Sequence, residues 1–273
     1  MVRGVMEDRY AETVLGRIRL RVAGSGPAIL FWPSLLMDGL LWRGQVEHFA
    51  DRYQVVLVDP PGHGGSSPLT RPFTFDECAR VIAQILDALE LDRVHVVGNS
   101  WGGMIGGTFA ARYPDRVGAA VLMNATASPA GRRQRAEYAA LTGAARVLGG
   151  VRGPLVRPVI DAFLGPTARR DKPEVVAAVN ESVRRVAIAS GRHAVTSVVP
   201  RRPDQRALFG RITAPVLVVA GAEDATFGVA ETRVMAEAIP GAEFVVLPAA
   251  AHLAALECPA EVNALIDGAI SLL

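Results

Sequence analysis

The residues best suited to chemistry surround one serine. Ser100 lies in the stretch Gly98-Asn99-Ser100-Trp101-Gly102-Gly103, directly after a short apolar run and before a helix-like segment. Glycine-x-serine-x-glycine between a strand and a helix is typical of a nucleophile elbow, a tight turn that strains the serine backbone and lifts its hydroxyl clear of a sheet. The positions two before and two after the serine must be small, because a Cβ there would clash with the adjoining strand or helix. The sequence therefore predicts Ser100 as a nucleophile.

A serine hydroxyl is a weak nucleophile unless a base activates it, and the chain has five histidines that could do so. His48 is expected on a helix face, His95 within a strand and His193 in a long insertion. His63, in a turn after a strand, is expected to be structural. His252 stands in a loop between the last predicted strand and the last predicted helix. We therefore predict His252 as the general base.

A carboxylate should orient this histidine and stabilise its cation. A buried strand is predicted directly before Gly221-Ala222-Glu223-Asp224. Asp224 has the Gly-x-x-Asp spacing that places a carboxylate just after such a strand, and Glu223 is the alternative. The predicted catalytic residues are thus Ser100, Asp224 and His252.

Short apolar runs alternate with helix-sized stretches along most of the chain. The runs lack an apolar-polar alternation, which is typical of parallel strands covered on both faces. This order predicts an α/β fold with a mostly parallel, doubly wound central sheet flanked by helices. Strands are expected at Ala28–Trp32, Gln54–Asp59, Arg93–Gly98, Ala119–Asn124, Pro215–Ala220 and Glu243–Leu247, and helices at Thr74–Leu91, Met104–Tyr113, Glu231–Ile239 and Pro259–Leu272.

The alternation stops between Ser128 and Phe209, where helix-like stretches occur at Arg135–Leu148 and Pro173–Ala189. The sequence therefore predicts a helical insertion over 128–209 in a core domain formed by 1–127 and 210–273. The insertion holds 15 basic and 6 acidic residues, a net charge of +9, whereas the whole chain carries +2. Such a basic segment beside a site predicts a preference for anionic substrates. The alternative is that arginine is simply the solubilising cation of a chain with one lysine.

The elbow, the turn Asp59–Ser66, the strand end at Asp224 and the His252 loop together resemble the α/β-hydrolase fold superfamily, in its serine-nucleophile branch. The resemblance covers nearly the whole chain, and serine, aspartate, histidine is the order that triads take in this superfamily. It implies an α/β-hydrolase fold in which the insertion is a cap. It also implies an enzyme that works through an acyl-enzyme on a Ser-His-Asp triad.

The loop expected to form an oxyanion hole departs from the pattern of that family. Family members commonly have His-Gly after the first parallel strand, where this chain has Pro33-Ser34. Leu35 then aligns with the residue whose backbone N–H faces the oxyanion, and the N–H of Trp101 is the second predicted donor. Backbone donors do not depend on side-chain identity, so the substitution is compatible with a working hole. The alternative is that Pro33–Leu36 only ends the strand.

Two loops give a narrower resemblance. Ser34–Asp38 with Trp42, and His252–Glu257 with Pro259, are similar to loops of 3-oxoadipate enol-lactonases and related carboxylic-ester hydrolases. The resemblance implies a serine hydrolase that cleaves a small carboxylic ester or lactone.

Other activities of the same fold stay open. Carbon–carbon bond hydrolases share a Gly-Asn-Ser-x-Gly-Gly elbow, but usually carry an aromatic residue where this chain has Leu253. Cofactor-free perhydrolase or haloperoxidase activity is a further alternative, as is a non-catalytic, ligand-binding receptor. Haloalkane dehalogenases and epoxide hydrolases resemble the chain through Ser100-Trp101, but Ser100 argues against both because they use an aspartate nucleophile.

The composition of the chain narrows the classes of protein, cofactor and partner that fit it. The 273 residues are 50% hydrophobic and 21% charged, which suffices for a core without disulfides or metal. Cys78 and Cys258 lie far apart without partners at metal-ligand spacing, as is typical of a reduced cytosolic chain. Met1–Val14 is charged and predicts no signal peptide. We therefore expect a cytoplasmic protein with a small-molecule substrate, no metal or organic cofactor, and neither a nucleic-acid nor a membrane partner.

Overall fold

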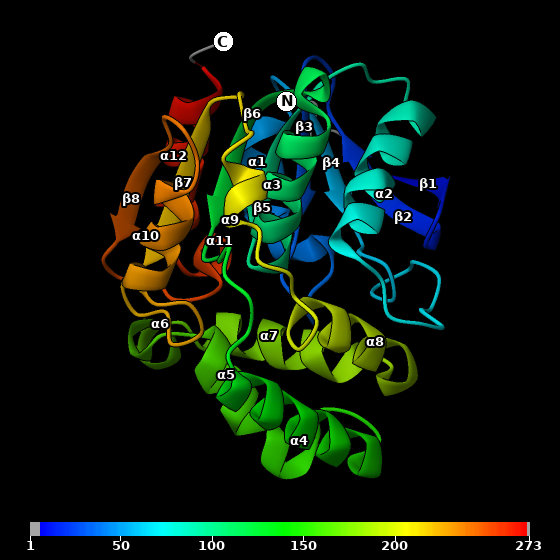
Figure 1. Ribbon diagram of the computed structural model, residues 1–273, viewed down its shortest axis with the longest axis vertical. Coiled ribbons are helices and arrows are strands. Elements are labelled where there is room, and N and C mark those ends of the chain that lie inside the picture. Colours follow the sequence, from blue (N-terminus) through cyan, green and yellow to red (C-terminus); the bar gives the residue numbers. More distant parts are fainter. Residues whose placement is uncertain (1–5, 272–273) are drawn as a thin grey trace.

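A mostly parallel β-sheet forms the centre of the protein, whose computed structural model describes residues 6–271. Its strands are β1 (Glu7–Thr13), β2 (Gly16–Ala23), β3 (Ala28–Trp32), β4 (Gln54–Val58), β5 (Val94–Asn99), β6 (Val117–Met123), β7 (Val216–Gly221) and β8 (Glu243–Leu247). The order across the sheet is β1-β2-β4-β3-β5-β6-β7-β8 (Figure 1). The pairs β1–β2 and β2–β4 are antiparallel, and all pairs from β4 to β8 are parallel.

All six predicted strands are present, and β3 and β8 have the predicted bounds, while the other four differ by one or two residues at one or both ends. Strands β1 and β2 were not predicted. In β1 only Ala11 is buried, so the strand has no apolar run. In β2 the buried Ile18 and Leu20 alternate with charged residues, which is the pattern of a strand covered on one face rather than two.

Helices cover both faces of the sheet, as predicted. Successive residues of β3 enter opposite cores: Leu30 and Trp32 pack on one side, and Ile29 and Phe31 on the other. Buried residues of α2 (Phe75–Ala88), α3 (Trp101–Arg112), α9 (Arg206–Phe209) and α10 (Val229–Glu237) belong to the first core, and those of η1 (Gly39–Trp42), α1 (Arg43–Phe49), α11 (Ala254–Glu257) and α12 (Pro259–Ile270) to the second. A short turn, η2 (Pro114–Arg116), precedes β6.

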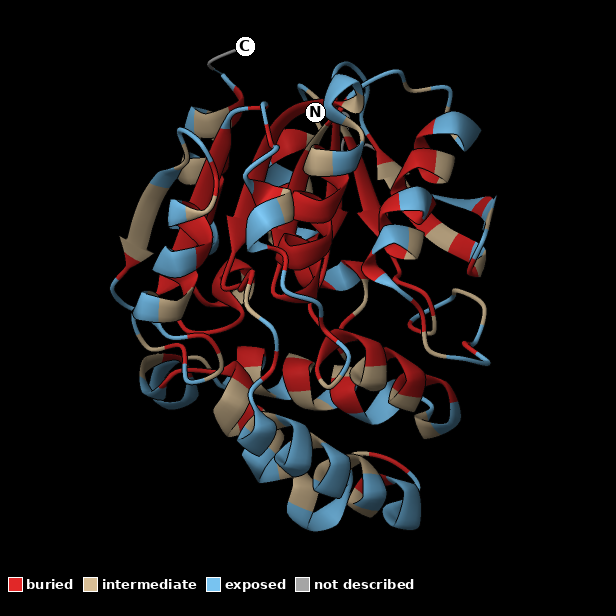
Figure 2. Cartoon of the chain, viewed as in Figure 1, coloured by how far each residue is buried: buried red, intermediate tan, exposed pale blue. Residues whose placement is uncertain are grey.

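The larger part of the segment between β6 and β7, residues 132–198, is helical and lies beyond the carboxyl ends of the parallel strands (Figure 1). Its helices are α4 (Arg132–Leu148), η3 (Gly153–Leu155), α5 (Val156–Phe163), α6 (Pro166–Asp171), α7 (Pro173–Arg185) and α8 (Ile188–Val198). Most of α4 is exposed, and Ala145 is its buried residue (Figure 2). The division into a core domain (1–127 and 210–273) and a cap (128–209) stays a prediction, and the ends of that core, 1–5 and 272–273, lie outside the described residues.

Some predicted helix bounds are wrong. The helix expected over Pro173–Ala189 ends at Arg185, because Val186 and Ala187 adopt extended backbone (ψ 118° and 115°) before α8 begins. The helix expected from Met104 begins at Trp101, directly after Ser100. The last helix ends at Ile270, and Leu272 of the predicted range lies outside the described residues.

Candidate active site

The predicted site residues follow four parallel strands. Leu35 comes after β3, Ser100 after β5, Asp224 after β7 and His252 after β8. Because the carboxyl ends of parallel strands meet at one edge of a sheet, these loops share the edge at which ligands bind in α/β folds. The helices from α4 to α8 lie beyond the same edge (Figure 1).

Ser100 occupies a strained turn between β5 and α3. Its backbone has φ 56° and ψ −110°, a conformation that side-chain-bearing residues rarely adopt. Its N–H donates to the carbonyl of Met123 at 2.8 Å. A Cβ on Gly98 would lie 2.1 Å from the Gly102 carbonyl oxygen, and a Cβ on Gly102 would lie 2.0 Å from that of Trp32. Backbone packs directly against both glycines, so neither position accepts a side chain.

His252 is fixed by a carboxylate and by a stacked aromatic ring. Its Nδ1 lies 2.9 Å from Asp224 Oδ2, and both side chains are buried. Asp224 Oδ1 accepts hydrogen bonds from the N–H groups of Thr226 (2.7 Å) and Phe227 (3.1 Å), so this carboxylate is held in place as well. The imidazole stacks on Phe163, with centroids 5.7 Å apart and planes 8° from parallel. This arrangement leaves Nε2 as the ring nitrogen that faces away from the carboxylate.

The alternative carboxylate, Glu223, has a different partner. It accepts hydrogen bonds from the backbone N–H of Thr167 (3.0 Å) and from the Thr167 hydroxyl. Glu223 therefore joins the loop after β7 to α6 of the helical insertion, whereas Asp224 contacts His252.

Ser100 and His252 line one cavity of about 230 Å³ between the sheet edge and the helical insertion. Most other lining side chains are apolar, including Leu35 and Leu36 from the loop after β3. Within residues 6–271, the Ser100 hydroxyl and the His252 ring are not joined by a hydrogen bond. Catalytic hydrogen bonds often tighten only when substrate binds. The other four histidines do not line this cavity in the described part of the chain.

The N–H groups of Leu35 and Trp101, the predicted oxyanion donors, take part in no hydrogen bond among the described residues. Leu35 lines the cavity, whereas Trp101 is not among its lining residues in the described part of the chain. Leu36 has φ 65°, and its N–H donates to His63 Nε2 at 3.2 Å. His63 Nδ1 lies 3.1 Å from the carbonyl of Pro61, so this nitrogen carries the proton of a neutral ring. Burial lowers the pKa of His63, which favours the same neutral form. His63 thus fixes the loop that carries Leu35.

Ser34, which stands where the chain departs from the family's His-Gly pattern, links this loop to the turn that carries Ser100. The side-chain amide of Asn99 donates to Ser34 Oγ at 2.7 Å, and Ser34 is fully buried. The loop that follows β3 is therefore tied to the residue that precedes Ser100.

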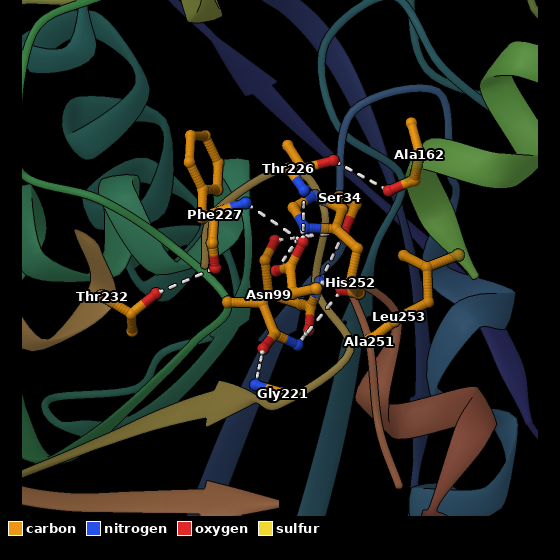
Figure 3. A network of polar contacts seen from close by, with 12 residues as sticks. Ser34, Asn99, Ala162, Gly221, Thr226, Phe227, Thr232, Ala251, His252 and Leu253 are labelled. Atoms are coloured by element: carbon orange, nitrogen blue, oxygen red, sulfur yellow. Dashed lines mark hydrogen bonds and ion pairs between the residues drawn. The ribbon is translucent and has the colours of Figure 1, made fainter. Parts of the chain in front are cut away.

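Asn99 and Asn124 are site residues that the sequence analysis missed. The side-chain amide of Asn99 donates to the His252 carbonyl at 2.6 Å (Figure 3). The side-chain amide of Asn124 donates to the same carbonyl at 3.2 Å, and Asn124 Oδ1 accepts from the N–H of Gly221 at 2.7 Å. Both asparagines are fully buried where a parallel strand ends. A polar residue at the end of an apolar run is the signal that could have indicated them.

Comparison with known proteins decides the family. A family model described as alpha/beta hydrolase fold matches residues 27–259. The chain belongs to the alpha/beta hydrolase fold family. The match confirms the predicted superfamily, and the sheet described above is the predicted mostly parallel one flanked by helices.

Relatives of this hydrolase include esterases and lactonases. The chain is 29% identical over 245 residues to 3-oxoadipate enol-lactonase 2 of Acinetobacter baylyi, covering 88% of this chain and 87% of that protein. It is similar to a thermophilic esterase from Thermogutta terrifontis, with 26% identity, a TM-score of 0.87 and 96% and 97% of the two chains covered. Over 102 residues, 37% of this chain and 33% of the relative, it is 41% identical to a 2-hydroxy-6-oxononadienedioate/2-hydroxy-6-oxononatrienedioate hydrolase of Burkholderia vietnamiensis.

The His252 loop of the hydrolase is also held by Glu257, which the sequence analysis did not single out. Glu257 Oε1 accepts from the N–H groups of Ala251 (3.1 Å) and Leu253 (3.0 Å), and Oε2 from that of Gly165 (3.1 Å). Burial raises the pKa of Glu257, while these hydrogen bonds oppose the shift. The carboxylate thus joins the loop on both sides of His252 to the helical insertion.

Residues 6–271 contain neither a metal-ligand cluster nor a membrane-spanning helix. No three histidine, cysteine, aspartate or glutamate side chains there are grouped to hold a metal ion. No helix in this range has the length and apolar character needed to span a membrane.

Proposed function

We propose that this hydrolase cleaves a small carboxylic ester or lactone through an acyl-enzyme. Ser100 is the nucleophile, His252 the general base and acid, and Asp224 the residue that orients the imidazole. The observation that carries the proposal is the shared cavity: Ser100 in its strained turn and the Asp224-bound ring of His252 line the same mostly apolar space. The likeness to an enol-lactonase and an esterase supports the choice of ester or lactone.

The first half-reaction forms the acyl-enzyme. His252 Nε2 takes the proton of Ser100 Oγ while Oγ bonds to the substrate carbonyl carbon. The electron pair of the carbonyl double bond moves to oxygen, and the N–H groups of Leu35 and Trp101 stabilise the resulting oxyanion. Collapse of this intermediate breaks the bond between the carbonyl carbon and the leaving oxygen. His252 gives its proton to the leaving alkoxide or enolate.

The second half-reaction restores the enzyme. His252 takes a proton from water as the water oxygen bonds to the acyl carbon, and the same backbone donors hold the second oxyanion. Collapse then breaks the bond to Ser100 Oγ, which recovers its proton from His252. Throughout both steps Asp224 stays ionised, holds Nδ1–H and stabilises the imidazolium.

Covalent labelling tests the proposal. A fluorophosphonate should react with the wild-type protein at Ser100, and Ser100→Ala should abolish labelling and lower turnover of a short p-nitrophenyl ester about 10⁴–10⁶-fold. Ser182→Ala, a serine of α7 outside the cavity, is the matched control and should retain both. Wild-type turnover at the level of buffer would favour a ligand-binding receptor, and comparable turnover by Ser100→Ala would contradict the covalent mechanism.

A second candidate activity is carbon–carbon bond hydrolysis. It is favoured by the 41% identity to the Burkholderia vietnamiensis hydrolase over 102 residues and by the Gly-Asn-Ser-x-Gly-Gly elbow. The chain has Leu253 after the histidine rather than an aromatic residue, which weighs against it. Comparing kcat/KM for a 2-hydroxy-6-oxodienoate and for a panel of esters and lactones decides between the two. We expect the esters or lactones to be cleaved faster.

A further inference from the structure

An arginine that has no carboxylate partner within residues 6–271 lies in the wall of the cavity. Arg202 follows α8 and is 2% exposed, and it lines the same space as Ser100 and His252. Its Nε donates to the Ser128 carbonyl at 2.8 Å, one Nη to the Val198 carbonyl at 3.4 Å, and the other to Gln134 Oε1 at 3.2 Å. All three acceptors are neutral.

In the part of the chain that the structure describes, the charge of Arg202 is therefore buried without a counterion. A guanidinium has five N–H donors and stays protonated in proteins, and three hydrogen bonds leave two of these donors free. Among the described residues no carboxylate lies within ion-pair distance of Arg202. Burial lowers the pKa of this guanidinium, which reflects the cost of holding the charge there. Buried charges in proteins are normally paired.

The carboxylates near the cavity do not neutralise Arg202. Glu137 is the acidic residue among its lining side chains in residues 6–271, and it is exposed on α4. The charge of Glu231 acts on Arg202 from outside the cavity wall. The insertion holds 15 basic residues, and Arg202 lines the cavity. The other 14 basic side chains of the insertion do not line it.

The guanidinium lies close to the reacting groups. It stands over the ring of Phe227, with Cζ 5.3 Å from the centroid, and the same ring lies 5.6 Å from the centroid of His252. One aromatic side chain thus separates the cation from the predicted base. A substrate held at Ser100 could place a second functional group at Arg202 while its reacting carbonyl stays at the serine.

We propose that Arg202 is a specificity-determining residue that binds a carboxylate on the substrate, so that the preferred ester or lactone is an anion. This inference rests on the proposed function, because it assigns the second recognition group of the same cavity. A carboxylate matches the two free N–H donors in charge and in fork geometry. The rest of the wall is mostly apolar and suits the chain that joins the carboxylate to the reacting carbonyl.

Matched esters test the assignment. Monomethyl glutarate and dimethyl glutarate differ in one charge, and their hydrolysis can be followed by titration of the released acid. The same pairs of succinate and adipate vary the distance between carboxylate and ester. We expect one or more monoesters to be preferred over the dimethyl ester, after correction for its two equivalent groups. In Arg202→Met the ratio of the two kcat/KM values should fall about 10–100-fold.

Arg201→Met is the matched control. Arg201 is the exposed neighbour of Arg202 and does not line the cavity, so its replacement removes the same charge from the surface. We expect this variant to keep the wild-type ratio. An equal fall in both variants would show a general field of the basic insertion and overturn the assignment. A wild-type ratio of about one for all three chain lengths would overturn it as well.

A binding measurement distinguishes the role proposed for Arg202 from the proposed hydrolytic function. With Ser100→Ala protein, calorimetry measures binding of the monoester and the dimethyl ester without turnover. Tighter binding of the monoester supports the assignment even if neither ester is hydrolysed by the wild-type protein, an outcome that would count against the proposed function alone. Equal binding overturns it. If Arg202→Met does not fold, Arg202→Lys keeps the charge without the fork, and we expect it to weaken binding of the monoester selectively.

Discussion

The side-chain amide of Asn99 donates a hydrogen bond of 2.6 Å to the backbone carbonyl of His252, although 153 residues separate them in the chain. Asn99 immediately precedes Ser100, so this bond joins the serine turn to the histidine loop. The same amide donates to Ser34 Oγ, which belongs to the loop that carries Leu35. One buried side chain therefore fixes three loops that hold the predicted catalytic groups (Figure 3).

This relationship predicts a specific effect of Asn99→Ala. Removing the amide leaves the His252 carbonyl and the Ser34 hydroxyl without this donor, and a buried polar group without its partner costs about 1–3 kcal/mol. We expect the free energy of unfolding to fall by that amount and kcat to fall roughly 10–100-fold, because small misplacements of catalytic groups are costly. Urea unfolding and ester kinetics measure the two effects.

Asn263→Ala is the control for Asn99→Ala. Asn263 is a buried asparagine of α12 that accepts a 3.0 Å hydrogen bond from Gln45 and does not line the cavity. Its replacement should lower stability with little effect on kcat. If the two variants lose kcat to the same extent, Asn99 has a structural role and no positioning role.

The two neighbouring acidic residues after β7 should differ in their effect on catalysis. Asp224→Asn removes the charge beside His252 Nδ1 and should lower kcat by roughly 10²–10⁴-fold, because the imidazole loses its orientation and its tautomer. Glu223→Gln affects the contact with Thr167 in α6 and should change kcat less than about tenfold, since a neutral acceptor remains. Measured kcat values that rank the two variants in the opposite order would reassign the carboxylate to Glu223.

The parallel strands, and the loops that place Ser100, Asp224 and His252 at one edge of the sheet, were predictable because local signals mark them. A strand covered on both faces needs a continuous apolar run, as in β3 and β7, and a strained serine turn needs small residues at Gly98 and Gly102. The strands β1 and β2 carry weaker signals, since one is largely exposed and the other is apolar on one face.

The features of the site that could not be predicted from the sequence depend on contacts between segments that lie far apart in the chain. Nothing local to Asn99 shows that it contacts His252, and nothing local to Arg202 distinguishes it from the exposed Arg201. Burial decides between these two arginines, and the burial of Arg202 is set by how α4 packs against α8. The strand ends that carry Ser100, Asp224 and His252 could therefore be predicted, whereas the contacts that Asn99 and Arg202 make with distant segments could not.

The close approach of backbone to Gly102 predicts a large effect of a single methyl group. In Gly102→Ala the new Cβ would lie 2.0 Å from the carbonyl oxygen of Trp32, so β3 and α3 would have to separate. We expect a loss of about 3 kcal/mol or more in the free energy of unfolding, as for severe overpacking. Urea unfolding measures it. Gly143→Ala in α4, where a Cβ meets nothing within 4 Å, is the control and should stabilise by about 0.5–1 kcal/mol.

The last prediction concerns pH and His63. Burial lowers its pKa in the folded protein, whereas in the unfolded chain the ordinary value is about 6.5. Between these two values the unfolded chain binds a proton that the folded protein excludes. Stability is therefore lost as pH falls from about 6.5 to the folded value, by up to about 1.4 kcal/mol per unit, and is flat below it.

His63→Gln tests this contribution, because a glutamine oxygen can still accept from the N–H of Leu36 but does not titrate. Urea unfolding at pH 7.5 and 5.5 should show a clear loss of stability in the wild-type protein and a smaller loss in the variant. Part of the loss should remain, since burial also lowers the pKa of His95 and of His193. His48→Gln, at an exposed histidine, is the control. If it reduces the acid-dependent loss as much as His63→Gln does, a buried neutral His63 is not the cause.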